Sequence, residues 1–105
     1  MHDRDNVKRG VYLMLVLYTE DRCGYCVLLK NKLKDWGHSY TEKNITYDAE
    51  SKEFIRNEGH KTVPQLYYND ADMLKGDSVY LTEDILNERM TIVAGLKKLI
   101  SGSYK

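Results

Sequence analysis

Apolar and polar residues fall into blocks along the chain, and the first apolar block has the length of a strand. Residues 11–18 read VYLMLVLY, an unbroken apolar run. Such a run predicts a strand covered on both faces, as at the centre of a sheet between helices. A core helix is the alternative, although eight residues are short for one. The mostly polar residues 1–10 predict a flexible lead-in to a single domain over residues 11–105.

The second block predicts a helix. Residues 26–36 carry apolar side chains at helical spacing, and Gly37 directly after them favours the end of the helix. The apolar face comprises Cys26, Leu29, Leu33 and Trp36. We therefore expect this face, including the single tryptophan, to pack into the core.

A second strand and a second, shorter helix are predicted next. Residues 40–47 have weaker strand character. Asp48 has the side chain of a helix N-cap, and the helix that it begins would end at Gly59. Phe54 and Ile55 are the residues of this helix that we expect to face the core.

The pattern after residue 60 predicts a hairpin closed by a helix. Residues 62–68 have strand composition, and Pro64 stands near their start, where a missing backbone N–H is best tolerated. Residues 69–72 predict a turn into a short strand around residues 73–74. Residues 82–100 are amphipathic at helical spacing and leave open whether they form one helix or two.

The predicted order is therefore strand, helix, strand, helix, strand, strand, helix. Its first half is typical of a parallel βαβ unit, and the later pair of strands is typical of an antiparallel β-hairpin. This order predicts the α/β class, with a small mixed four-stranded sheet flanked by helices.

Length and charge limit the classes of function. The 105 residues correspond to one domain, in which 16 Lys and Arg balance 16 Asp and Glu. A net charge of zero argues against binding to nucleic acid or an anionic membrane through net charge. No segment reaches the roughly 18 apolar residues of a membrane span. We therefore expect a soluble cytoplasmic protein that binds neither nucleic acid nor membrane.

The candidate chemistry lies in two cysteines, Cys23 and Cys26, where the first predicted strand meets the first predicted helix. The start of a helix offers unpaired backbone N–H groups and the positive end of the helix dipole, and both stabilise a thiolate. An ordinary thiol with a pKa of about 8.5 is only about 3% ionised at pH 7. The dipole contributes about 1 kcal/mol, so a pKa near about 6 also needs hydrogen bonds from the amides of Tyr25 and Cys26. Arg22 would help to stabilise the thiolate.

These positions assign different roles to the two thiols. We interpret Cys23 as the nucleophile and Cys26, one turn into the helix and more buried, as the resolving thiol. Glu20 and Asp21 carry negative charge next to this site and oppose the ionisation of Cys23.

A zinc site is the alternative use of two such cysteines. It would require further ligands from His2, His38 and His60. His38 and His60 are 22 positions apart, which does not match the paired spacing of structural zinc sites. We therefore predict no metal site and expect these two histidines near helix ends at the surface.

Three stretches of the sequence together resemble the glutaredoxin family. They are LYT at 17–19 leading into CGYC at 23–26, KTVPQ at 61–65, and KGDS at 75–78. A CxxC pair alone is weakly specific, but its combination with TVP at this distance is specific, and the resemblance covers residues 11–100. It implies the thioredoxin fold and the reduction of disulfides and glutathione mixed disulfides, with glutathione as electron donor.

The resemblance also implies a set of residues that bind the substrate. They are Tyr25, Lys61, Thr62, Val63, Pro64, Asp77 and Ser78. By this resemblance the Val63–Pro64 bond would be cis and would present the backbone of Val63 to an extended thiol peptide, which would pair with it like an extra strand.

Glutathione carries two carboxylates and one ammonium group, and the resemblance implies a partner for each. Lys61 would face the glycine carboxylate, Asp77 the ammonium group, and the amide of Ser78 the neighbouring carboxylate. Tyr25 would line the approach to the sulfur, with its hydroxyl near the glycine end.

The sequence departs from the family pattern at two places near the cysteines. Gly24 stands where many relatives have proline, and Glu20 where they have lysine. Loss of the lysine removes a usual cation near the thiolate. Some relatives with a small residue at the position of Gly24 bridge a [2Fe–2S] cluster between two subunits, with glutathione as co-ligand.

Several hypotheses of function follow. The one that we favour is a glutathione-dependent thiol–disulfide oxidoreductase, a monomer without a bound cofactor, in which Cys23 and Cys26 form a disulfide during the reaction. The alternatives are a thioredoxin-like redoxin that serves ribonucleotide reductase through a flavoprotein reductase, and a non-catalytic [2Fe–2S] carrier bridged by glutathione. A binding module that keeps the fold without a redox cycle is a further one.

Overall fold

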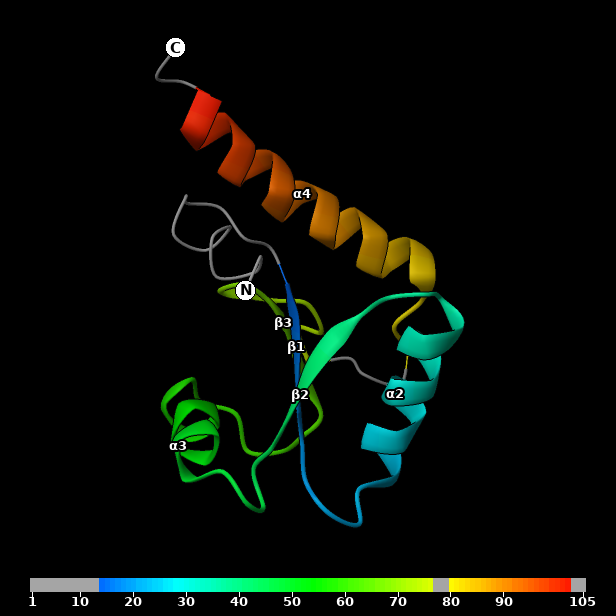
Figure 1. Ribbon diagram of the computed structural model, residues 1–105, viewed down its shortest axis with the longest axis vertical. Coiled ribbons are helices and arrows are strands. Elements are labelled where there is room, and N and C mark those ends of the chain that lie inside the picture. Colours follow the sequence, from blue (N-terminus) through cyan, green and yellow to red (C-terminus); the bar gives the residue numbers. More distant parts are fainter. Residues whose placement is uncertain (1–13, 77–79, 103–105) are drawn as a thin grey trace, which may run out of the picture.

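The computed structural model describes residues 14–76 and 80–102 (Figure 1). The predicted lead-in, residues 1–10, and the first three residues of the predicted first strand, residues 11–13, lie outside this part of the chain. No helix in the described part of the chain is both long enough and apolar enough to cross a membrane.

The fold is α/β, with one mixed sheet between helices. The elements in chain order are β1 (Leu15–Thr19), α2 (Gly24–Asp35), β2 (Tyr40–Asn44), α3 (Ala49–Asn57), β3 (Gln65–Tyr68), β4 (Ala71–Asp72) and α4 (Glu83–Gly102). The strand order is β2-β1-β3-β4; β1 and β2 are parallel, whereas β3 is antiparallel to both of its neighbours. The predicted βαβ unit, β-hairpin and four-stranded sheet are confirmed.

The central strand β1 supplies side chains to two separate hydrophobic clusters, one on each face of the sheet. Leu15 and Leu17 belong to the first cluster, which is closed by leucines of α2 and by Leu86 of α4. Val16 and Tyr18 belong to the second, which includes Ile55 of α3. Figure 1 accordingly shows α2 and α3 on opposite sides of the sheet. This arrangement explains the unbroken apolar run, because both faces of β1 are covered.

The predicted end of α2 is confirmed. Gly37 has a φ of +78°, the left-handed conformation that glycine adopts most easily. The N–H of Gly37 donates to the carbonyl of Lys34 at 3.0 Å, and the N–H of His38 donates to that of Leu33 at 2.9 Å. These bonds satisfy carbonyls that the end of the helix leaves free. Trp36, at the helix C-cap, is half-buried against the first cluster, as predicted.

The short fourth strand was predicted two residues too late: it comprises Ala71–Asp72, not residues 73–74. Asn69 has a φ of +57°, which tightens the turn so that Tyr68 pairs directly with Ala71. The carboxylate of Asp72 then accepts hydrogen bonds from the N–H groups of Leu74 and Lys75, at 2.9 and 3.0 Å. This Asx turn ends the strand.

Other boundaries differ from the sequence pattern by a few residues. The segment 62–64 precedes β3 as a loop, and β2 ends at Asn44 instead of residue 47. The helix α2 already begins at Gly24. The C-terminal pattern forms a single helix, α4.

Candidate active site at the start of helix α2

Cys23 and Cys26 are joined by a disulfide bond at the start of α2, after the loop that connects β1 to this helix. Cys23 is the N-cap residue of the helix, with extended backbone angles, and its side chain is half-buried. Cys26 lies in the first turn and is 1% exposed. The sequence placed Cys23 at the helix start and Cys26 deeper in the fold, and the structure has both there.

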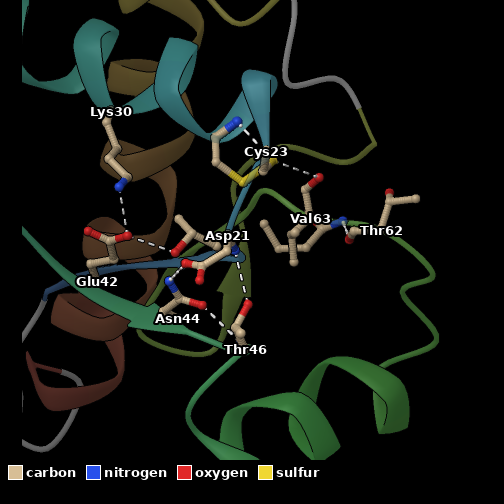
Figure 2. The surroundings of a disulfide bond; sticks show 11 residues. Asp21, Cys23, Lys30, Glu42, Asn44, Thr46, Thr62 and Val63 are labelled. Carbon is tan, nitrogen blue, oxygen red and sulfur yellow. Dashed lines mark hydrogen bonds and ion pairs between the residues drawn. A yellow bond between two sulfur atoms is a disulfide. The ribbon is translucent and has the colours of Figure 1, made fainter.

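Two polar backbone groups lie close to the sulfur of Cys23. The N–H of Cys26 points at Cys23 Sγ over 3.1 Å, and the carbonyl oxygen of Val63 lies 3.7 Å from the same sulfur (Figure 2). Of the two amides predicted as donors, that of Cys26 has this role within the described residues, and that of Tyr25 does not. A donor on this sulfur favours the thiolate over the thiol once the disulfide is reduced.

The Val63–Pro64 peptide bond is cis, as the family resemblance implies. It belongs to the loop before β3, and both residues are buried. This loop brings the backbone of residues 62–63 next to Cys23, 40 positions away in the chain.

Two hollows flank this loop, and Thr62 and Val63 line both of them. The first, the Tyr25 hollow, measures about 340 Å³ and extends over Pro64 toward Leu74 and Gly76. The second, the Lys61 hollow, measures about 260 Å³ and extends toward α3. Its full lining is Glu20, Ile45, Lys52, Ile55, Arg56, His60, Lys61, Thr62 and Val63.

The predicted substrate-binding residues therefore divide into two groups. Tyr25 is 59% exposed and lines one hollow, whereas Lys61 is exposed and lines the other. Asp77 and Ser78 lie outside the described residues, directly after Gly76 of the Tyr25 hollow.

On the other side of Cys23, a third hollow of about 410 Å³ is bordered by the loop of residues 20–22. This loop is held by Asp21, whose carboxylate accepts hydrogen bonds from Asn44 at 3.0 Å and from the hydroxyl of Tyr47. The N–H of Asp21 donates to Thr46 Oγ1 at 3.0 Å. Figure 2 shows Asp21, Asn44 and Thr46 close together beside Cys23.

The sequence pattern missed this network, because its members lie 23 to 26 positions apart. The bonds from Tyr47 and Asn44 lower the pKa of the Asp21 carboxyl, while Asp21 raises the pKa of Tyr47. Asp21 is therefore a fixed negative charge near the cysteines. In the same loop, Arg22 has a φ of +60° and lines the third hollow.

Lys30, a cation of α2 that also lines the third hollow, is already paired. Lys30 forms an ion pair with Glu42 at 2.8 Å, and Glu42 also accepts a hydrogen bond from Thr19 at 2.7 Å. These contacts lower the pKa of Glu42, with Lys30 as the main cause. Lys30 is thus oriented toward Glu42, which leaves the helix start, together with Arg22, to stabilise a thiolate at Cys23.

An aromatic cluster packs against the loop that contains Val63. Tyr18 stacks on Phe54 with ring centroids 5.1 Å apart, and both rings contact Tyr67 edge-on. The hydroxyl of Tyr67 lies 2.7 Å from His60 Nε2, and burial is the main cause that raises the pKa of Tyr67 to about 12. Cys26 and Val63 pack in the same hydrophobic cluster, which joins the cysteine pair to the loop.

The histidines have partners other than a metal. His38 lies 3.1 Å from Asn87 Oδ1, and His60 contacts Tyr67. Each follows the end of a helix and is half-buried. His2 lies outside the described residues. Within residues 14–76 and 80–102, no group of three His, Cys, Asp or Glu side chains could hold a metal ion.

Arg89 of α4 is a further residue that the pattern did not single out. Its guanidinium donates to the carbonyls of Met73 and Leu74, at 2.5 and 3.2 Å. This clamp fixes the segment that leads into Lys75 and Gly76, at the far end of the Tyr25 hollow. A lone arginine on a helix carries no sequence signal for such a contact.

Glu20 lines both the Lys61 hollow and the third hollow, so its charge acts on the cysteine from an exposed position. We expect Glu20→Lys to shift the pH at which reduced Cys23 becomes reactive to a lower value and to lower the KM for a negatively charged disulfide by about threefold. Asp35→Lys makes the same change in charge at the other end of α2 and should leave both unchanged. Alkylation rates against pH and steady-state kinetics measure the two effects; equal behaviour of both variants would contradict this expectation.

The sequence of this chain matches a known protein family. Residues 15–72 match the sequence profile of the family described as Glutaredoxin. A Mycobacterium tuberculosis protein named as a glutaredoxin, found in two strains, is 31% identical over 83 residues, which is 77% of this chain and 94% of that protein.

Solved structures share the fold. The buckwheat glutaredoxin–glutathione complex superimposes with a TM-score of 0.57 at 19% identity, over 86% of this chain and 84% of that one. The thioredoxin-like protein BC3987 gives a TM-score of 0.51 at 22% identity, over 55% of this chain and 81% of that one. The fold is therefore the thioredoxin fold, as the resemblance implied.

Proposed function

Because this chain belongs to the glutaredoxin family, we propose that it is a glutathione-dependent thiol–disulfide oxidoreductase that reduces protein disulfides and glutathione mixed disulfides. One observation carries the proposal: Cys23 caps α2, is joined to Cys26 and lies 3.7 Å from the carbonyl of Val63. A sulfur in this position meets both requirements of the reaction, a helix start that stabilises the thiolate and a second thiol within bonding distance.

The reaction proceeds by two exchanges. The thiolate of Cys23 attacks one sulfur of the substrate disulfide, and the other sulfur leaves as a thiolate that takes up a proton. Cys26 loses its proton to solvent, attacks the sulfur of Cys23 and releases the second substrate thiol. The substrate gains two electrons, and the Cys23–Cys26 disulfide forms. Two glutathione molecules then return the electrons and leave as glutathione disulfide.

The two hollows support glutathione as the co-substrate. Glutathione is an extended tripeptide with charged groups at both ends, and its cysteine would pair with the backbone of Val63. The glycine carboxylate would lie in the Lys61 hollow, and the other end would lie in the Tyr25 hollow. Asp77 and Ser78, which the family resemblance implies as its partners, follow Gly76 in the sequence. This arrangement separates Tyr25 from the glycine end. That a buckwheat relative of the same fold forms a complex with glutathione is in keeping with it.

The proposal includes the setting of the reaction. We place the protein in the cytoplasm, because a reducing compartment keeps the dithiol supplied with electrons. We also propose that it acts as a monomer. Ribonucleotide reductase is the protein substrate to test first. No nucleic acid, membrane or resident metal takes part. Residues 11–105 would act as the single catalytic domain, preceded by the lead-in of residues 1–10.

A coupled assay tests the electron donor. With NADPH, glutathione and glutathione reductase, the protein should reduce a glutathione mixed disulfide; with NADPH and thioredoxin reductase alone, it should not. The reverse result would favour the thioredoxin-like redoxin. Visible absorbance after anaerobic purification, together with a glutathione-dependent dimer, would favour the [2Fe–2S] carrier instead.

The ionisation of Cys23 is tested separately. We expect the rate at which iodoacetamide alkylates the reduced protein to rise with pH, with an inflection well below about pH 8.5, which is the pKa of an ordinary thiol. Mass spectrometry should locate the label on Cys23, since Cys26 is 1% exposed. Bound glutathione should slow the labelling. An inflection near pH 8.5 would show that the helix start does not activate this thiol.

A further inference from the structure

We propose that the Lys61 hollow selects protein substrates with acidic residues directly after the reactive cysteine. The inference rests on the proposed function, because it assumes that Cys23 attacks a cysteine of the substrate. It goes beyond glutathione, since it assigns a sequence preference among protein disulfides and two residues of α3, Lys52 and Arg56, to that preference.

The charges of the hollow carry the inference. Three of its lining side chains are cationic at neutral pH, Lys52, Arg56 and Lys61, and Glu20 is the single acidic one. Within the described residues, none of the three cations forms an ion pair or a side-chain hydrogen bond. Glutathione would bring one carboxylate, that of its glycine, to this end of the site. The hollow therefore offers more positive charge than glutathione uses.

The fold places these cations on one wall. Lys52 and Arg56 are four positions apart on α3, so they lie on the same face of the helix. Lys61 follows the end of α3 and begins the loop to Val63. All three are exposed, and the wall continues directly into the backbone of residues 62–63 that lies beside Cys23.

The direction of the loop determines which substrate residues reach this wall. From Lys61 to Pro64 the chain runs from the Lys61 hollow toward the Tyr25 hollow. A substrate that adds to it as an antiparallel strand runs the opposite way. With its cysteine at Val63, the following residues lie in the Lys61 hollow and the preceding residues in the Tyr25 hollow.

The test uses short peptides and the full chain with both cysteines reduced, without glutathione. Each peptide carries one cysteine in a mixed disulfide with chromogenic thionitrobenzoate, and release of this group gives the rate of attack. The cysteine is followed by two Glu, two Gln or two Lys, and a fourth peptide has the two Glu before the cysteine. Glutathione with the same chromogenic group is measured alongside.

We expect the peptide with two following Glu to react about fivefold to tenfold faster than the Gln peptide, because one exposed ion pair is worth about fivefold at most and the two Glu can form two such pairs. The Lys peptide should be slowest, and the peptide with preceding Glu should resemble the Gln peptide. The preference should shrink from about 0.02 M to about 0.5 M NaCl, since salt screens exposed charges.

Charge variants assign the preference to α3. The double variant Lys52→Gln, Arg56→Gln should bring the ratio of Glu to Gln rates to about one, and Lys52→Glu, Arg56→Glu should invert it. Lys34→Gln removes an equal charge from exposed α2 and should leave the ratio unchanged. The ratio is read within each variant, so a general change in reactivity does not affect it.

Failure of the inference differs from failure of the proposed function. If all peptides react equally but glutathione reacts quickly, the acidic preference is wrong and the oxidoreductase stands. Preference for preceding Glu, or a ratio insensitive to charge reversal on α3, also overturns it. If neither peptides nor glutathione react faster with the protein than with free cysteine, the proposed function itself is wrong.

Discussion

Cys23→Ser should abolish both the reduction of glutathione mixed disulfides and the reduction of protein disulfides. The hydroxyl that replaces the thiol is scarcely ionised at neutral pH, so the helix start has no anion to stabilise and the first exchange cannot begin. We expect a loss of at least about 10³-fold in kcat/KM for both reactions, as for other enzymes that lose their nucleophile. The coupled assay with glutathione reductase measures the first activity, and insulin reduction measures the second.

Two controls separate this loss from misfolding. The side chain of Cys23 is half-buried, and the substitution only replaces sulfur by oxygen. The free energy of unfolding of the reduced variant should therefore lie within about 0.5 kcal/mol of that of the reduced wild type. Urea denaturation followed by circular dichroism measures this. The reduced variant should also lose the fast phase of iodoacetamide labelling. Appreciable residual turnover in a folded Cys23→Ser protein would show that Cys26 can act alone, which contradicts the assigned roles.

The hydrophobic pattern was sufficient to predict the fold, because a strand that is buried on both faces has an unbroken run of apolar residues in the sequence. The unbroken run that contains β1 predicts a central strand, and the structure covers it on both faces. The pattern failed where single backbone angles decide. The left-handed Asn69 and the Asx turn of Asp72 move the fourth strand to Ala71–Asp72, and neither changes hydrophobic spacing.

The site shows the same division between local and long-range information. The helix start and the CxxC spacing are local, so the sequence predicts the placement of Cys23 and Cys26. The hydrogen bonds of Asp21 with Asn44 and Tyr47 join two loops, and the Arg89 clamp joins α4 to the segment after β4. Such contacts depend on the tertiary arrangement and have no signature in spacing or composition.

The two sides of Cys23 consequently differ in charge. On the side of the third hollow, Asp21 offsets the charge of Arg22, and Lys30 is paired with Glu42. On the side of the Lys61 hollow, cations of α3 and its following loop that have no ion partner among the described residues line the same hollow as Val63. A negatively charged disulfide substrate would therefore approach Cys23 over the loop, not over the third hollow. This asymmetry is the basis of the acidic preference that we propose.

Cys26→Ser should separate the two activities. Cys23 remains, so a glutathione mixed disulfide can still exchange with it, and glutathione from solution can complete the cycle; we expect this rate within about threefold of wild type. Reduction of an intramolecular protein disulfide should fall by at least about 100-fold, because no second thiol is placed to release the bound substrate.

The trapped intermediate gives a direct readout. Mass spectrometry should detect the mixed disulfide between Cys23 and the protein substrate in Cys26→Ser, but not in wild type. Because Cys26 is 1% exposed among apolar side chains, Cys26→Ala repeats the test without burying a hydroxyl. If both variants kept full activity on protein disulfides, Cys26 would not be the resolving thiol; if both lost the glutathione activity while folded, the attack would require both sulfurs.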